Sequence, residues 1–256
     1  MPSDPRCSVT EMVAPGYLVE ADGLVKAYRG RRVVDGISIN VASGEIVGLL
    51  GPNGAGKTTS FYIIVGLTRA TAGRVFFRGQ QITRLPMYRR ARLGMGYLSQ
   101  EPSIFRKMTV EQNVWAILET RCDITNEEKH NRLEELLDML GITQLRRQPA
   151  YTLSGGERRR TEIARNLALN PKFLLLDEPF AGIDPIAVHE IKGIITSLKS
   201  QGIGILITDH NVRDTLDITE ISYIIHNGEL KAKGTPRELM GNDLARSLYL
   251  GENFQM

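Results

Sequence analysis

The chain has 256 residues, of which 42% are hydrophobic and 24% are charged, and its formal net charge is +3. This composition is typical of a globular protein with a full core, in one large domain or two small ones. All apolar runs are far shorter than the roughly 18 residues of a membrane helix, so we expect no bilayer-spanning segment. The first residues lack the apolar centre of a secretory signal, and Cys7 and Cys122 form neither a disulfide framework nor a zinc spacing. These features favour a reducing cytosol.

The basic residues of the chain form several clusters. The net charge is mild, and no aromatic residues alternate with the clusters as they do on surfaces that stack single-stranded nucleic acid. We therefore interpret the clusters as solvated helix faces and expect no nucleic-acid partner. They lie at residues 31–32, 89–92, 146–147 and 158–160.

The N-terminal part of the chain is predicted to contain a leader followed by β-structure. Residues 1–16 are polar and contain three prolines, which predicts a disordered leader. Short alternating patterns then predict an antiparallel β subdomain, with a turn at residues 30–31. The predicted strands cover residues 17–20, 24–28, 33–41 and 74–78.

An apolar run at residues 46–50 leads into a glycine-rich stretch with the spacing G-x-x-x-x-G-K-[ST], and a helical pattern follows. Glycines allow positive φ and bring backbone N–H groups close to phosphate oxygens, and the helix start adds unpaired donors. Lys57 supplies a charge for the β- and γ-phosphates, and the Thr58 hydroxyl can ligate Mg²⁺. The residues expected to hold a nucleoside triphosphate here are Gly51, Pro52, Asn53, Gly54, Ala55, Gly56, Lys57, Thr58 and Thr59.

Residues 101–165 have helical patterns and predict an inserted α-helical subdomain. One helix begins near Thr109, and a second begins at the capping box formed by Thr125 and Glu128. The apolar residues of the second helix recur at the spacing of one helix face, which is typical of core packing. They are Leu133, Leu136, Leu137 and Leu140, and Gly141 ends the helix.

The β pattern resumes in the last third of the chain. Strands are predicted from residue 172 and from residue 204, with a helix at residues 187–200 between them. Asn227 and Gly228 predict a β-hairpin, and Thr235, followed by proline, predicts the start of a further helix.

Four apolar runs are each followed by a polar stretch. These stretches are the glycine-rich loop, Gln100, Asp177 with Glu178, and a group that ends in His210. In an open parallel sheet, ligands bind beyond the carboxyl ends of the strands, so these side chains can converge on one nucleotide. Asp177 is placed to hold Mg²⁺ through water, and Glu178 to act as general base on the attacking water. Gln100 could hold water or metal, and His210 could bond the γ-phosphate or serve a structural role.

A second candidate anion site lies at Ser154, Gly155, Gly156 and Glu157, far in sequence from the first. Ser154 and Glu157 have the spacing of a capping box, so they could simply begin a helix. The two glycines, however, leave the N-terminus of that helix bare, as a backbone anion site requires. Two half-sites in one chain suggest two copies that complete one another.

These motifs in this order resemble the nucleotide-binding subunits of ABC transporters over residues 17–235. The matching motifs are the Walker A loop, the Q-loop at Gln100, the signature at residues 153–157, Walker B at residues 173–178, the D-loop at residues 181–184, and the switch histidine His210. Glu157 stands where the family usually has glutamine.

The resemblance implies an α/β fold of the P-loop NTPase, ABC type: a mixed parallel core sheet, an antiparallel β subdomain and an inserted α-helical subdomain. It implies one ATPase domain at residues 17–240, with a short C-terminal extension at residues 241–256. It further implies a head-to-tail homodimer that holds two ATP molecules with Mg²⁺. Tyr28 would stack on adenine, although from its pattern alone it could equally be a strand former. Ser154, Gly155, Gly156, Glu157 and Asp184 would contact the nucleotide, and Thr58, Gln100 and Asp177 the metal.

Within the family, residues 103–106, 180–186, 206–213 and 249–254 resemble the ATPases of lipopolysaccharide export. This implies two membrane-embedded permease subunits resembling LptF and LptG, with LptC, and a position on the cytoplasmic face of the inner membrane. Phe105 and Arg106 match the region that contacts the permeases, although an exposed loop with one aromatic anchor would look the same.

Three alternatives remain open from the sequence. ATPases of branched-chain amino-acid importers share much of the finer pattern. A soluble ABC-type factor acting on DNA or ribosomes usually carries long coiled-coil insertions or two cassettes, which this chain lacks. The hypothesis of a kinase or GTPase does not account for the stretch at residues 153–157.

Overall fold

The computed structural model describes residues 16–250, without the side chain of Leu250. The expected leader, apart from Gly16, and residues 251–256 of the expected C-terminal extension lie outside the described residues. The strands are β1 (Val19–Tyr28), β2 (Arg31–Val41), β3 (Ile46–Leu50), β4 (Ala72–Phe77), β5 (Gln80–Gln81), β6 (Met95–Leu98), β7 (Phe173–Asp177), β8 (Gly204–Thr208), β9 (Ile221–His226) and β10 (Glu229–Gly234). The helices are α1 (Lys57–Val65), α2 (Met87–Arg92), α3 (Val110–Leu118), α4 (Asn126–Met139), α5 (Gly155–Leu167), α6 (Pro185–Ser200), α7 (Val212–Leu216), α8 (Pro236–Met240) and α9 (Asp243–Ala245), with short turns η1 (Thr143–Leu145), η2 (Ala150–Thr152) and η3 (Arg246–Leu250).

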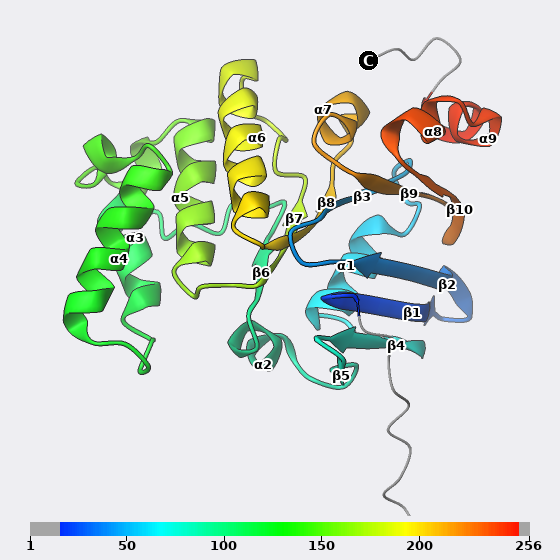
Figure 1. Ribbon diagram of the computed structural model, residues 1–256, viewed down its shortest axis with the longest axis horizontal. Coiled ribbons are helices and arrows are strands. Elements are labelled where there is room, and N and C mark those ends of the chain that lie inside the picture. Colours follow the sequence, from blue (N-terminus) through cyan, green and yellow to red (C-terminus); the bar gives the residue numbers. More distant parts are fainter. Residues whose placement is uncertain (1–15, 251–256) are drawn as a thin grey trace, which may run out of the picture.

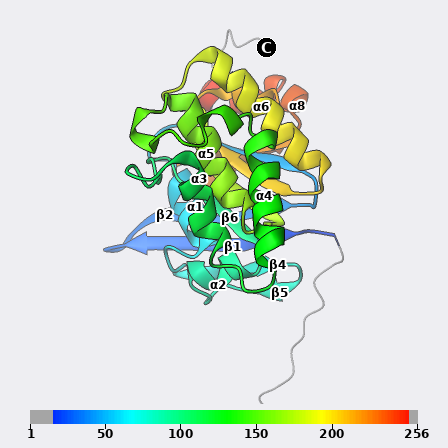
Figure 2. The same cartoon turned by 90° about the vertical axis from the view of Figure 1, so that its left-hand side faces the viewer.

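The strands form two sheets. The core sheet has the order β10-β9-β3-β8-β7-β6 and is parallel except for the antiparallel strand β10 at its edge. The second sheet, β2-β1-β4-β5, is antiparallel and lies beside the core sheet (Figure 1). Together with the helices α3 to α5, which gather at one end of the molecule, this arrangement confirms the expected mixed sheet, antiparallel subdomain and helical insertion (Figures 1 and 2).

The central strands are buried on both faces, as their continuous apolar runs predict. Along β7, Phe173 and Leu175 pack in the cluster that contains α1 and the antiparallel sheet. Leu174 and Leu176 alternate with them and pack with α5 and α6 on the opposite face. Helix α1 therefore lies between the two sheets, and its first residue stands at the edge where β3 ends.

The antiparallel sheet differs from expectation in two details. The segments at residues 17–20 and 24–28 form the single strand β1, whose register shifts between Ala21 and Leu24 because Gly23 adopts a positive φ of 55°. The turn that follows contains Arg29 and Gly30 rather than residues 30–31. Both turn residues have positive φ, which matches the twist of a two-residue hairpin.

The helical subdomain begins its helices at the caps that the sequence predicts. Thr125 and Glu128 form a complete capping box on α4, and Thr109 caps α3 with a box that also includes Gln112. The predicted leucine stripe of α4 is buried, and Gly141, with φ of 60°, follows the helix. These local signals are confirmed because a cap depends on residues only three positions apart.

The last third of the chain also follows its local signals. Asn227 and Gly228 both have positive φ and join β9 to β10, and Thr235 caps α8 with Pro236 at its first position. Across residues 16–250, none of the helices has the length and apolar character needed to span a membrane.

Arg90 on α2 anchors the C-terminal end of α1. Its side chain is fully buried, and Nη1 donates to the carbonyls of Ile63 at 2.8 Å and Ile64 at 2.6 Å. Nε and Nη2 donate to the carbonyls of Leu85 and Thr83. Burial lowers the pKa of Arg90 to about 10, so the guanidinium keeps its charge at neutral pH. The positive group therefore satisfies carbonyls at the negative end of the α1 dipole.

Replacing Arg90 with methionine should lower the free energy of unfolding by about 2–4 kcal/mol, because several buried carbonyls lose their donor. Urea unfolding measures this change. Arg89→Met is the matched control, since Arg89 lies exposed on the same helix, and it should change stability by about 0.5 kcal/mol or less. Equal stabilities of the two variants would contradict the anchoring role.

Candidate nucleotide-binding site

The glycine-rich loop connects the buried strand β3 to helix α1. At Gly51, with φ of 154°, a Cβ would lie 2.2 Å from the carbonyl oxygen of Ile225. At Gly56, with φ of 107°, a Cβ would lie 2.6 Å from the carbonyl oxygen of Val33. Only glycine fits at these two positions. Gly56 caps α1 without a side-chain bond, so the first N–H groups of the helix stay available to an anion.

Lys57, the first residue of α1, is held inside the loop. Its Nζ donates to the carbonyl of Gly51 at 2.6 Å and to the carbonyl of Pro52 at 3.1 Å. Burial lowers the pKa of Lys57, while the neighbouring carboxylates of Glu178 and Asp177 act in the opposite direction. The loop thus presents a positive charge at a fixed position next to the helix N-terminus.

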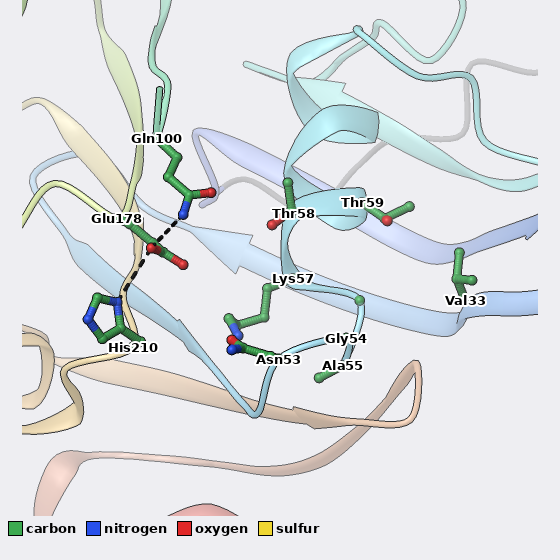
Figure 3. A pocket seen from close by; sticks show the side chains of 11 residues that line it. Val33, Asn53, Gly54, Ala55, Lys57, Thr58, Thr59, Gln100, Glu178 and His210 are labelled. Atoms are coloured by element: carbon green, nitrogen blue, oxygen red, sulfur yellow. Dashed lines mark hydrogen bonds and ion pairs between the residues drawn. The ribbon is translucent and has the colours of Figure 1, made fainter. Parts of the chain in front are cut away.

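A cavity of about 730 Å³ opens in front of this loop. Figure 3 shows its lining residues, with the side chain of Lys57 on one side and those of Gln100, Glu178 and His210 on the other. Among the residues predicted from the sequence, the structure brings into this lining Asn53, Gly54, Ala55, Gly56, Lys57, Thr58, Thr59, Gln100, Glu178 and His210. Val33, which the sequence did not indicate, also lines the cavity.

The strand order explains why these residues meet. Strands β3, β8, β7 and β6 are neighbours and parallel, so their carboxyl ends share one edge of the sheet. The glycine-rich loop, His210, Glu178 and Gln100 each follow one of these strands. This is the position at which open α/β sheets bind ligands.

Glu178 is the centre of the polar group opposite the loop. Gln100 Nε2 donates to Glu178 Oε2 at 2.8 Å, and His210 Nδ1 lies 3.4 Å from the same oxygen. The backbone of Glu178 has a positive φ of 46°, which is rare outside glycine and often found at functional sites. The carboxylate is therefore held by two partners from other strand ends and faces the cavity.

Asp177 lies behind Glu178 and is buried. Its Oδ2 accepts a hydrogen bond from the Tyr97 hydroxyl at 3.2 Å, whereas its Oδ1 is buried without a protein partner. Burial raises the pKa of Asp177 to about 6. A buried carboxylate oxygen without a protein partner fits a hard cation with oxygen ligands such as Mg²⁺, held directly or through water.

No cluster of three or more His, Cys, Asp and Glu side chains within the described part of the chain could hold a metal by itself.

The segment at Ser154 lies apart from this cavity. Ser154 caps α5 and forms a complete capping box with Glu157. Gly156 packs against α6, where a Cβ would lie 2.5 Å from the Cβ of Ala187, so this glycine also serves close helix packing. Ser154, Gly155, Gly156 and Glu157 are all absent from the cavity lining.

The other predicted contact residues also lie outside the cavity lining. Gly51 and Pro52 contribute carbonyls to Lys57 instead. Asp184 caps α6 by accepting from the N–H groups of Ile186 and Ala187. Tyr28 ends β1 with its side chain half exposed.

Arg159 is a residue near the site that the sequence interpretation missed. The cluster at residues 158–160 was expected on a solvated helix face, but Arg159 is buried. Its guanidinium donates to the carbonyls of Ser99, Asp177 and Glu178 at 2.8, 3.0 and 3.2 Å. Ile163, four residues later on the same face of α5, is the one signal in the sequence that this position points inward.

Comparisons with known proteins identify the family. The model of the ABC transporter family matches residues 34–181. The chain is 52% identical over 239 residues to the Haemophilus influenzae protein named lipopolysaccharide export system ATP-binding protein LptB, covering 93% of this chain and 99% of that protein.

Solved structures with a similar fold are also ATP-binding cassettes. An ATP-binding cassette of an ABC transporter in its ADP conformation has a TM-score of 0.83 and 28% identity, covering 92% of this chain and 99% of that chain. A dimeric cassette in a post-hydrolysis state, bound to ADP and Pi, has a TM-score of 0.76 and 25% identity, covering 86% and 99%. The mixed sheet, the helical insertion and these matches lead to one conclusion: the chain belongs to the ABC transporter family and has the fold of its ATP-binding cassettes.

Proposed function

We propose that this chain is the ATP-hydrolysing subunit of a lipopolysaccharide exporter. The observation that carries the proposal is the carboxylate of Glu178, held by Gln100 and His210 across one cavity from the phosphate-binding loop. The assignment of lipopolysaccharide rests on the name of the relative with 52% identity, which spans nearly the whole chain.

Glu178 is the general base in this proposal. Its Oε2 is oriented by Gln100 and faces the cavity in which the γ-phosphate would lie. There the carboxylate accepts a proton from the attacking water. His210 donates to the γ-phosphate, and Lys57 with the N–H groups of the loop stabilises the negative charge that develops on it.

Magnesium fits the oxygen groups of the site. Thr58 and Gln100 would contact the ion directly, and Asp177 would contact it through water. When bound, Mg²⁺ neutralises charge on the phosphate oxygens. Through the ion, Thr58 and Gln100 would help to position the phosphates, and the buried Asp177 would accept hydrogen bonds from the water bound to the ion.

The functional unit is a homodimer. Ser154, Gly155, Gly156 and Glu157 do not line the cavity of their own chain, and they form the N-terminus of α5, where Ser154 and Glu157 cap the helix. In a head-to-tail dimer this helix start would face the γ-phosphate held by the partner. Asp184, at the start of α6, and Tyr28, at the edge of β1, would complete the nucleotide contacts.

A separate cavity of about 360 Å³ is the proposed contact for membrane-embedded permeases resembling LptF and LptG, with LptC. It is lined by Pro102, Ile104, Arg106, Ala150, Tyr151 and Arg158. Phe105 lies beside it with 43% of its surface exposed, and the guanidinium of Arg165 lies 4.3 Å from its ring centre. An aromatic side chain held by a cation next to a concave surface is typical of a protein-binding anchor. Binding there would keep the chain at the cytoplasmic face of the inner membrane.

Glu178→Gln should lower the rate of ATP hydrolysis by about 10²–10⁴-fold, because the amide cannot accept the proton. Equilibrium binding of ATP should stay intact, since the phosphate-binding loop is unchanged. Phosphate release and nucleotide binding are measured side by side, with Glu127→Gln on the exposed face of α4 as control. If Glu178→Gln hydrolysed ATP at the original rate, Glu178 would not be the general base.

Ser154→Arg, introduced into the Glu178→Gln protein, should abolish dimer formation with ATP, because the bulky side chain fills the surface that faces the partner's nucleotide. The ATP affinity of the single chain should not change. Light scattering after size exclusion measures the dimer, and Ser200→Arg at the end of α6 serves as control. A loss of ATP binding by the monomer, or a normal dimer, would contradict the shared site.

Phe105→Ala should reduce retention of the permease subunits by about tenfold, since anchors of this kind carry much of the binding energy. The measurement is co-purification in detergent from cells that express the whole transporter. Tyr17→Ala, which removes another exposed aromatic side chain, should retain the permeases. Recovery of nucleic acid without any membrane protein would overturn the transporter assignment.

A further inference from the structure

Three polar side chains lie near the ends of neighbouring strands, and the residues Gln100, Glu178 and His210 that follow these strands line the cavity. The three side chains are those of Tyr97 on β6, Asp177 on β7 and Thr208 on β8. Asp177 and Thr208 are paired in register, so their side chains lie on the same face of the sheet. That face packs with α1, because Leu175 and Leu206, two residues before them, belong to the cluster that contains α1.

Tyr97 fixes the rotation of the Asp177 carboxylate. Its hydroxyl donates to Asp177 Oδ2 at 3.2 Å, across 80 residues of sequence. With Oδ2 occupied, the carboxylate has one oxygen left for any other partner.

A side chain on the neighbouring strand also has a buried oxygen without a partner. Asp177 Oδ1 and Thr208 Oγ1 are both buried without a hydrogen-bond partner in the protein. Both residues are 1% exposed. Leaving buried oxygens unpaired costs stability, so two of them on paired residues beside a ligand cavity require a reason.

We propose that Tyr97 and Thr208 are positioning residues for magnesium-bound ATP. Tyr97 holds Asp177 so that Oδ1 accepts a hydrogen from metal-bound water, and the Thr208 hydroxyl bonds to the same water shell. The inference rests on the proposed function, since it takes Mg²⁺ with ATP as the ligand. Neither residue contacts the reacting atoms, so both act through Asp177 and through water.

A purely structural role makes the opposite predictions. If Thr208 only filled space, the isosteric change Thr208→Val would remove an unpaired hydroxyl and leave metal binding unchanged. If Tyr97 only joined β6 to β7, Tyr97→Phe would lower stability and leave metal binding unchanged. Metal dependence therefore separates the two readings.

The test uses the full chain with Glu178→Gln, so that ATP is not consumed. Affinity for a fluorescent ATP analogue is measured with Mg²⁺ and with EDTA, and the ratio of the two affinities reports the contribution of the metal. Tyr97→Phe and Thr208→Val should each lower this ratio by about tenfold, as partners around metal ligands typically do. The affinity in EDTA should not change, and Thr208→Ser, which keeps the hydroxyl, should preserve the ratio.

Matched controls are Tyr223→Phe and Thr219→Val. The Tyr223 hydroxyl accepts from the Asn40 N–H at 3.2 Å, and the Thr219 hydroxyl bonds to Ser222, both away from the cavity. These variants lose a buried hydroxyl but should keep the original ratio. An unchanged ratio in both Tyr97→Phe and Thr208→Val would overturn this inference but leave the proposed function standing. If the Glu178→Gln protein failed to bind the analogue, the proposed function would be overturned as well.

Discussion

The parallel pairing of β3, β8, β7 and β6 is the constraint on which the rest of this structure depends. Each strand is apolar and buried on both faces, and each ends at the same edge of the sheet. Because these strand ends lie side by side, the sheet brings Gln100, Glu178 and His210, which follow them, to the same cavity as the loop that carries Lys57. The hydrophobic core thus fixes the geometry of the polar site.

The charged groups of the site support the proposed binding of a nucleotide with a divalent cation. The ammonium group of Lys57 faces the carboxylates of Glu178, Asp177 and Asp209. Burial raises the pKa of Asp177 to about 6 and also raises that of Asp209.

Arg159 links the helix that starts at Ser154 to the strand ends. Its buried guanidinium donates to backbone carbonyls at Ser99, Asp177 and Glu178, and its Nη1 also contacts the carboxylate of Glu162 at 3.2 Å. These hydrogen bonds tie α5 to the ends of β6 and β7. The helix that begins at Ser154 is therefore joined through Arg159 to the backbone of Glu178.

The sequence by itself determined the features that depend on near neighbours along the chain. The glycine-rich loop, the capping box at Thr125 and the hairpin at Asn227 are set by residues a few positions apart, and all formed where they were predicted. Only the tertiary structure decided which carbonyls Arg159 reaches and that Tyr97 bonds Asp177 across 80 residues. Such contacts depend on which faces pack together and on how strands order in the sheet, and neither is encoded in any short stretch of sequence.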